Sequence, residues 1–167
     1  MSETAPVSVE PASCPSEGCS MSEADAERAH CPVSGTIGPT VDLITLKALL
    51  KVDALRRLEG KAYRFCPEPD CGVVYFDCTA DSVFKRTDVS VPVTQKERGD
   101  STPLCYCFGY SVGDVRRDLA ENGGALVPAA ITREIRAGHC ACEVRNPQGT
   151  CCLGNIAVAV RSLSREP

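Results

Sequence analysis

The pattern of apolar and polar positions separates a polar beginning from stretches that predict regular structure. Residues 1–29 are rich in Ser, Glu, Ala and Pro, and we expect them to form a disordered tail. Leucines recur over Leu43–Leu58 with roughly helical spacing, although Asp53 leaves open whether this is one helix. Short aromatic and β-branched runs then predict strands at Tyr63–Phe65 and Val73–Phe76.

The later part of the chain reads as mainly helical. Residues 111–122 predict a helix with Ser111 as N-cap and a Gly-Gly pair after its end. Residues 128–137 predict a second helix, with Pro128 in the first turn and Gly138 after the end. Residues 156–163 predict a short helix or strand. Before these elements, residues 89–94 fit an edge strand, because a proline interrupts them, and a polar linker follows.

The composition points to metals as a source of stability. Of 167 residues, 43% are hydrophobic but only 5% are aromatic, and Trp is absent. Such a chain builds a modest core, and small cores usually need cross-links or metals. The twelve cysteines can supply them. A net charge of −4 argues against a nucleic-acid partner.

The beginning of the sequence bears on the compartment. Residues 1–11 are acidic and polar, unlike a secretory signal, and no apolar run approaches the roughly 20 residues of a transmembrane helix. We therefore expect a cytoplasmic protein without membrane insertion, whose clustered cysteines are reduced and bind metal. The alternative is a secreted disulfide scaffold.

Three cysteines in the middle of the chain suggest a zinc-type site. Cys66 and Cys71 bracket a tight turn with C-x4-C spacing, which is within the ligand spacing of zinc knuckles. Cys31 lies in another turn, CPVSG. Thiolates from two such turns could form a tetrahedral site.

Six cysteines near the end of the chain form three close pairs. These are Cys105, Cys107, Cys140, Cys142, Cys151 and Cys152. A [2Fe–2S] cluster needs four thiolates, as does a Zn(Cys)4 site, so the spacing alone selects neither the metal nor the ligands. Surplus thiols can also be plain buried side chains.

At these residues the sequence resembles a known family. LCYCFGYSVGDV and GHCACEVRNPQGTCCLGN are similar to the [2Fe–2S] domain of CopZ-type copper chaperones, which is related to bacterioferritin-associated ferredoxins. The family pattern is C-x-C, a helical segment, a cysteine four residues before an Asn-Pro-x-Gly turn, and Cys-Cys. The resemblance therefore implies four cluster ligands: Cys105, Cys107, Cys142 and Cys152. Cys140 is additional to this pattern, and two choices stay open: Cys151 or Cys152, and Cys140 or Cys142.

The middle segment is similar to the zinc-binding domain of the same family. CPVSG and FCPEPDCGVVYF match its CPxCG-like start and its FC-x4-C-x-VYF segment, which implies Cys31, Cys66 and Cys71 as zinc ligands. Ser34 stands where the family has a fourth cysteine. The candidates for the fourth ligand, besides water or an external thiol, are Cys78, His30, Cys19 and Cys14.

The resemblance implies a metallochaperone-like function. The cargo would be copper or another soft heavy metal, the cluster would donate one electron to the incoming ion, and a metal-transport or redox protein would be the partner. The family's M-x-C-x-x-C loop is absent from this sequence. One alternative is a ferredoxin-like electron-transfer module that serves a protein partner, and another is a structural zinc scaffold. No nucleotide-binding or hydrolase motif occurs, so metal-ion reduction is the enzymatic activity to consider.

Together these features predict an α+β protein in which a small β-rich zinc-binding module precedes a helical [2Fe–2S]-binding module. The expected boundaries are a tail at 1–29, the zinc-binding module at 30–86, a linker at 87–103 and the cluster-binding module at 104–164.

Overall fold

The first part of the structure is a small antiparallel sheet packed against helices. The structure is a computed structural model, and it describes residues 30–124 and 126–165. The tail predicted at 1–29, with Cys14 and Cys19, lies outside the described residues. The sheet has the order β1-β2-β3-β4, and its strands are β1 (Thr40–Val41), β2 (Tyr63–Phe65), β3 (Val73–Asp77) and β4 (Val83–Lys85). The predicted strands at β2 and β3 are confirmed.

The central strand β3 is buried along its whole length, because cores lie on both of its faces. Tyr75 belongs to the main core, which also contains Phe65, opposite it on β2, and Leu46 from the helix α2 (Leu43–Leu49). Phe76 belongs to a second, smaller core that contains the cysteines of the first module. The strand therefore separates the hydrophobic core from the thiol groups.

The leucine-rich segment forms two short helices, α2 (Leu43–Leu49) and α3 (Val52–Leu55). The chain is extended at Leu50, which forms an isolated bridge with Val89, and the Lys51 N–H bonds the Asp88 carbonyl. A pairing between distant segments thus interrupts the helical pattern at the point the sequence left open.

The edge strand predicted at 89–94 is wrong. Beyond the Val89 bridge this segment leads into the 3₁₀ turn η2 (Thr94–Lys96), and another such turn, η1 (Arg86–Asp88), precedes it. The Pro92 carbonyl accepts a hydrogen bond from the Tyr106 hydroxyl, which in turn accepts one from the Thr94 N–H. Contacts with the second module therefore replace a strand pairing here.

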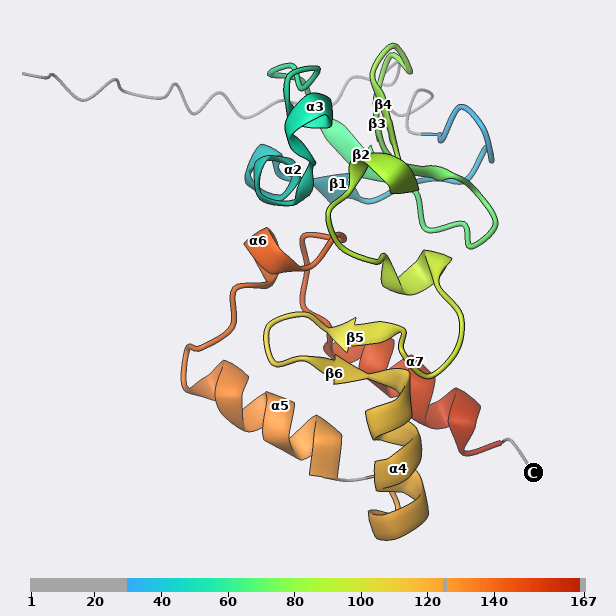
Figure 1. The fold of residues 1–167 in the computed structure, drawn as a ribbon, viewed down its shortest axis with the longest axis vertical. Coiled ribbons are helices and arrows are strands. Elements are labelled where there is room, and N and C mark those ends of the chain that lie inside the picture. The colour runs from blue at the N-terminus through green and yellow to red at the C-terminus, as the bar shows by residue number, and fades with distance from the viewer. Residues whose placement is uncertain (1–29, 125, 166–167) are drawn as a thin grey trace, which may run out of the picture.

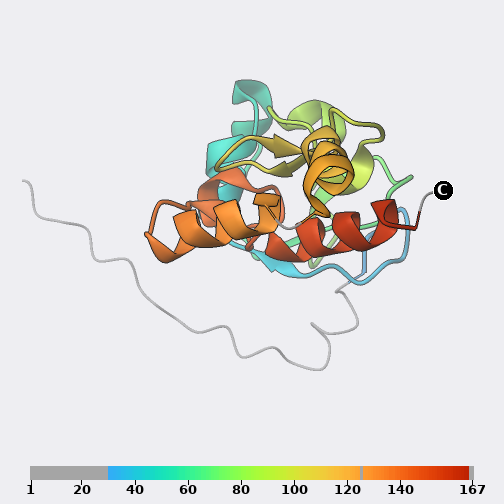
Figure 2. The ribbon, with the colours of Figure 1, turned by 90° about the horizontal axis from the view of Figure 1, so that it is seen from below.

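The second part of the chain is mainly helical. A hairpin of β5 (Pro103–Cys105) and β6 (Tyr110–Ser111) leads to α4 (Val112–Asn122), α5 (Leu126–Arg136), α6 (Cys142–Arg145) and α7 (Leu153–Leu163). The predicted cap is present, because the Ser111 hydroxyl accepts from the Asp114 N–H and the Asp114 carboxylate accepts from the Ser111 N–H. Helices α4, α5 and α7 pack on one another (Figures 1 and 2).

The two parts touch through α6 and the turn that follows it. Figure 1 shows α6 beneath α2, and these two helices are in contact. The Thr45 hydroxyl of α2 donates to the Glu143 carbonyl, and the Tyr75 hydroxyl donates to the Pro147 carbonyl at 2.9 Å. None of the helices in the described part of the chain has both the length and the apolar character needed to cross a bilayer.

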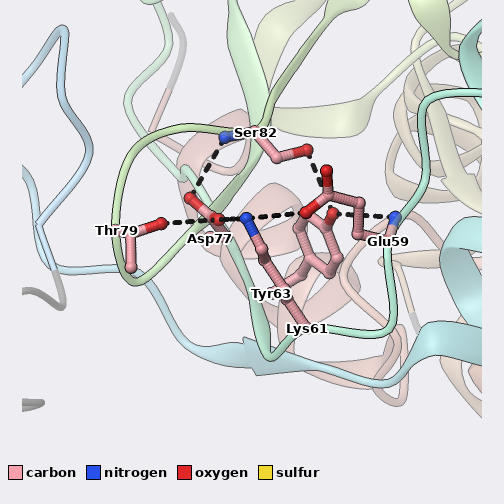
Figure 3. A network of polar contacts seen from close by, with 6 residues as sticks. All are labelled: Glu59, Lys61, Tyr63, Asp77, Thr79 and Ser82. Carbon is pink, nitrogen blue, oxygen red and sulfur yellow. Dashed lines mark hydrogen bonds and ion pairs between the residues drawn. The ribbon is translucent and has the colours of Figure 1, made fainter.

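A buried carboxylate organises the hairpin between β3 and β4 (Figure 3). The Asp77 side chain is 1% exposed and accepts hydrogen bonds from the Thr79 hydroxyl at 2.8 Å and the Ser82 N–H at 3.2 Å. Lys61 forms an ion pair with it at 3.2 Å. Burial alone would raise the pKa of Asp77, but these three partners outweigh burial and lower the pKa.

We expect Asp77→Asn to lower the free energy of unfolding at pH 7 by about 2 kcal/mol, a typical value for hydrogen bonds to a charged group. The pKa of Asp77 is lower in the folded protein than in the unfolded chain, where it is near 3.9. The contribution of Asp77 to the free energy of unfolding is therefore complete above that unfolded pKa, and it is lost as the pH falls through the folded pKa. Urea unfolding should thus give a constant difference from wild type between about pH 5 and 7, and a shrinking one below about pH 4. Exposed Asp81 lies in the same turn, so Asp81→Asn is the control. An equal loss in both variants would contradict the assignment.

Candidate metal centres

The first site lies where β2 ends and β3 begins. The Cys66 N–H donates to the Val74 carbonyl at 2.9 Å, which continues the ladder beyond β2 and fixes Cys66 at its edge. The Cys71 N–H donates to the Glu68 carbonyl at 3.3 Å and closes the connecting turn. Lys96, which is 4% exposed, donates its ammonium hydrogen to the same carbonyl. The sheet and this turn therefore hold both thiols in place.

The third thiol comes from a tight loop that packs on the sheet. The Gly35 N–H bonds the Cys31 carbonyl at 2.8 Å, and the Cys31 N–H bonds the Thr36 carbonyl at 2.9 Å. Gly35 has a φ of 70°, a conformation that side-chain-bearing residues rarely adopt. The CPVSG turn thus points Cys31 inward, as the sequence predicted for a ligand-bearing turn.

The three sulfur atoms of Cys31, Cys66 and Cys71 all lie within 4.8 Å of one another, and all three residues are buried. The Cys31 and Cys71 sulfurs are 3.8 Å apart. A tetrahedral centre with metal–sulfur bonds of about 2.3 Å has sulfur–sulfur edges of about 3.8 Å. The arrangement therefore fits a zinc-sized ion at the centre of three thiolates.

Burial and local hydrogen bonds act on these thiols in opposite directions. Burial raises the pKa of Cys31, but hydrogen bonds from the Ser34 hydroxyl and from the Ser34 and Val33 backbone outweigh it, so the pKa falls to about 7. Burial raises the pKa of the Cys71 thiol. Cys31 is thus the thiol of this pair that ionises more readily.

The other candidate ligands in the described residues lie elsewhere. Cys78 follows β3 at the opposite end from Cys71. His30 is exposed, and its Nδ1 is 2.8 Å from the Gly35 carbonyl oxygen. Neither joins the three-cysteine group.

The second site draws thiols from three separate segments. The Cys107 and Cys142 sulfurs are 3.8 Å apart, which again matches the distance between two sulfur ligands of one tetrahedral metal ion. Cys105 and Cys152 form a second pair through a side-chain hydrogen bond, which lowers the pKa of Cys105 to about 6 and raises that of Cys152. The structure therefore brings together the four cysteines that the resemblance selected, as two pairs.

Backbone hydrogen bonds link these two pairs with each other and with the neighbouring part of the chain. Burial raises the pKa of Cys142 to about 12 although the Cys152 N–H bonds its sulfur, and the charges of Cys107 and Cys151 also raise it. The Ala141 N–H donates to the Cys107 sulfur at 3.3 Å. The four donors are soft sulfur atoms and mostly buried, a donor set typical of both iron–sulfur clusters and zinc sites.

The Asn-Pro-Gln-Gly turn holds the last two ligand segments together. Asn146 is 1% exposed; its side chain donates to the Thr150 carbonyl at 2.6 Å and accepts from the Gln148 N–H at 3.2 Å. Gly149 has a φ of 67°, and a Cβ there would come within 3.1 Å of the Thr45 hydroxyl. Asn146 is thus required for the hydrogen bonds of the turn, and Gly149 is required for the close contact of the turn with the first module.

Two thiols of the second module remain outside its two pairs. Cys140 is half-buried, and Cys151 is the exposed one among the described cysteines. They correspond to the two surplus thiols that the sequence predicted.

Comparison with known proteins identifies the first module. Residues 28–90 match the family profile zf_CopZ, described as a zinc binding domain. The first module is therefore similar to the zinc-binding domain of the CopZ family. The prediction of zinc for this part of the chain is thereby confirmed.

The likeness to CopZ extends beyond this zinc-binding domain. The chain is 32% identical over 123 residues to the copper chaperone CopZ of Archaeoglobus fulgidus, covering 74% of this chain and 57% of that protein. The X-ray structure of the CopZ N-terminal domain matches 77% of this chain and 95% of its own length, with a TM-score of 0.65 and 27% identity. Residues 28–90 are well under half of this chain, so the structural match includes part of the second module. The chain is therefore homologous to a copper chaperone and spans little more than half of its length.

Sequence reasoning did not find the residues that hold the second site against the first module. Thr45 bonds the backbone carbonyl of Glu143, shortly before the Asn-Pro-Gln-Gly turn, and Tyr75 bonds the carbonyl of Pro147 within it. In the sequence both look like ordinary helix or strand positions. Their role depends on contacts between residues 72 to 98 positions apart, and no local pattern encodes such contacts.

Proposed function

We propose that this protein handles copper or another soft heavy-metal ion, using zinc in the first module and a [2Fe–2S] cluster in the second. The zinc ligands in this proposal are Cys31, Cys66 and Cys71. The cluster ligands are Cys105, Cys107, Cys142 and Cys152. When bound, a [2Fe–2S] cluster supplies one electron at a time.

The observation that supports this proposal is the convergence of two thiol pairs in a chain homologous to a copper chaperone. The sulfurs of Cys107 and Cys142 are one tetrahedral edge apart, and Cys105 contacts Cys152. The donor set contains only soft sulfur atoms, which favour iron–sulfur clusters, zinc and Cu(I) over hard cations. The homology favours a chaperone-like role, with copper as cargo and a metal-transport or redox protein as partner.

The cargo step needs an acceptor thiol that the cluster leaves free. Cys151 is exposed and directly precedes Cys152. Cu(II) prefers nitrogen and oxygen ligands, whereas Cu(I) prefers thiolate. One electron passed to bound Cu(II) would therefore favour its retention by Cys151 as Cu(I), with Cys140 as the second available thiol.

The test uses anaerobically purified full-length protein with measured iron and zinc contents. We expect the reduced protein to be reoxidised by one equivalent of Cu(II) and to retain the copper as Cu(I) through a desalting column. Cys151→Ser should keep its iron and its visible absorption but retain much less copper.

Two results would count against this proposal. Copper that neither reoxidises the reduced protein nor stays bound would contradict the metallochaperone role, and electron delivery to a redox partner alone would favour the ferredoxin-like alternative. A colourless, iron-free protein would favour a structural zinc scaffold.

A further inference from the structure

A serine hydroxyl lies beside the three thiols of the first site. The Ser34 Oγ is 3.4 Å from the Cys66 sulfur, and the Ser34 side chain also bonds Cys31. It thus contacts two of the three candidate ligands. The cysteines are at most 6% exposed, whereas Ser34 is only half-buried. Ser34 is therefore the member of this group that solvent reaches most easily.

No stronger ligand completes the site within residues 30–124 and 126–165. The group of metal-binding side chains there stops at Cys31, Cys66 and Cys71. A neutral hydroxyl is a much weaker zinc ligand than a thiolate. Closed structural zinc sites have four protein ligands, whereas sites with three keep a fourth position for water or an incoming molecule.

Two exposed apolar side chains flank Ser34 in the sequence. Val33 is 69% exposed and Ile37 is 63% exposed, one on each side of the serine in sequence. An arriving polypeptide could bury these side chains as it brings a ligand to the metal. Thr36 reaches across to the second ligand turn, where its hydroxyl is 3.5 Å from the Glu68 carboxylate, so the loop that bears Ser34 is held in place.

We infer that Ser34 keeps the fourth coordination position of this site open to an incoming thiol, so that the metal leaves by ligand exchange. The chemical class of the partner is a thiol-bearing peptide or protein. This inference rests on the proposed three-cysteine zinc site and deepens it. In the exchange, the incoming thiolate first forms a metal–sulfur bond as the weakly held oxygen ligand departs. Further incoming thiolates then displace the three protein thiolates, which take up the protons that the incoming thiols release, and no electron is transferred.

The experiment is zinc-edge X-ray absorption on the full-length, anaerobically purified protein, kept in a phosphine reductant free of thiols. This method reports on zinc alone even when iron is bound. We expect wild type to show three sulfurs at about 2.3 Å and one lighter atom at about 2.0–2.2 Å. Added β-mercaptoethanol should replace the lighter atom with a fourth sulfur.

Substitutions at Ser34 give the matched comparison. Ser34→Cys should show four sulfurs with or without added thiol. It should release zinc to a fluorescent chelator on the order of 10-fold more slowly than wild type, because a fourth thiolate replaces the weakly held oxygen ligand. Ser34→Ala should behave like wild type in the thiol titration. Ser162→Cys adds a thiol to an exposed site on α7 and should leave zinc unchanged.

Three outcomes would overturn the inference. One is a wild-type site that already has four sulfurs, which would implicate Cys14 or Cys19. Another is a zinc release rate in wild type that added thiol leaves unchanged. The third is a protein that purifies without zinc, which would also remove the proposed three-cysteine site, whereas the first two contradict only the role of Ser34.

Discussion

Cys107→Ser and Cys142→Ser are each expected to lose most of the bound iron and the brown colour. The two sulfurs are 3.8 Å apart, so each variant removes one half of a ligand pair. A serine hydroxyl stays protonated at neutral pH and cannot replace a soft thiolate. Iron per chain and the visible absorption spectrum measure the effect directly.

The neighbouring surplus thiols provide the controls for this experiment. Cys140→Ser should keep wild-type iron, because Cys142 is the buried member of its pair. Cys151→Ser should do the same, whereas Cys152→Ser should lose iron. If the Cys107 and Cys142 variants stay as brown as the parent, the proposed ligand set is wrong.

Cys66→Ser is expected to lose zinc and to destabilise the first module. Cys66 is fully buried in a small core whose non-thiol members, among the residues that the structure describes, are Val73 and Phe76, with Val83 at its margin. Such a core provides little apolar burial, so bound metal must contribute much of the local stability. We expect the free energy of unfolding to fall by on the order of 3 kcal/mol or more, as is typical when a structural metal is lost.

The measurements are zinc per chain and thermal unfolding, with hydrogen exchange at β2 and β3 to locate the loss. Cys78→Ser is the matched control, since Cys78 is a half-buried cysteine at the far end of β3. It should keep its zinc and change stability by less than about 1 kcal/mol. Retention of one zinc by Cys66→Ser would contradict the assignment of Cys66.

The sequence predicted those parts of the fold that depend on local signals. Short aromatic and β-branched runs predicted β2 and β3, and the Ser111 cap and the Gly-Gly pair predicted the two ends of α4, where Gly123 has a φ of 70°. The family pattern around the Asn-Pro-Gln-Gly turn selected the four cysteines that the structure brings together.

Elements set by distant contacts were not predictable in this way. The break between α2 and α3 depends on Leu50 bridging to Val89, and the absence of a strand around Pro92 depends on Tyr106. Helical spacing and β propensity describe a segment alone, whereas these contacts join residues from separate parts of the chain. The place of Ser34 came from the family pattern and not from a local signal, and the structure puts its Oγ 3.4 Å from the sulfur of Cys66, 32 residues away.

The hydrogen bond from Tyr75 to Pro147 couples the structure of the two proposed metal sites. Tyr75 lies on β3, the strand that begins two residues after Cys71, and Pro147 lies in the turn between Cys142 and Cys152. Any loosening of β3 on zinc loss would therefore reach the backbone between two cluster ligands. If the proposed zinc ion and cluster are both bound, zinc depletion of a cell would then weaken the proposed cluster site without any change in iron supply.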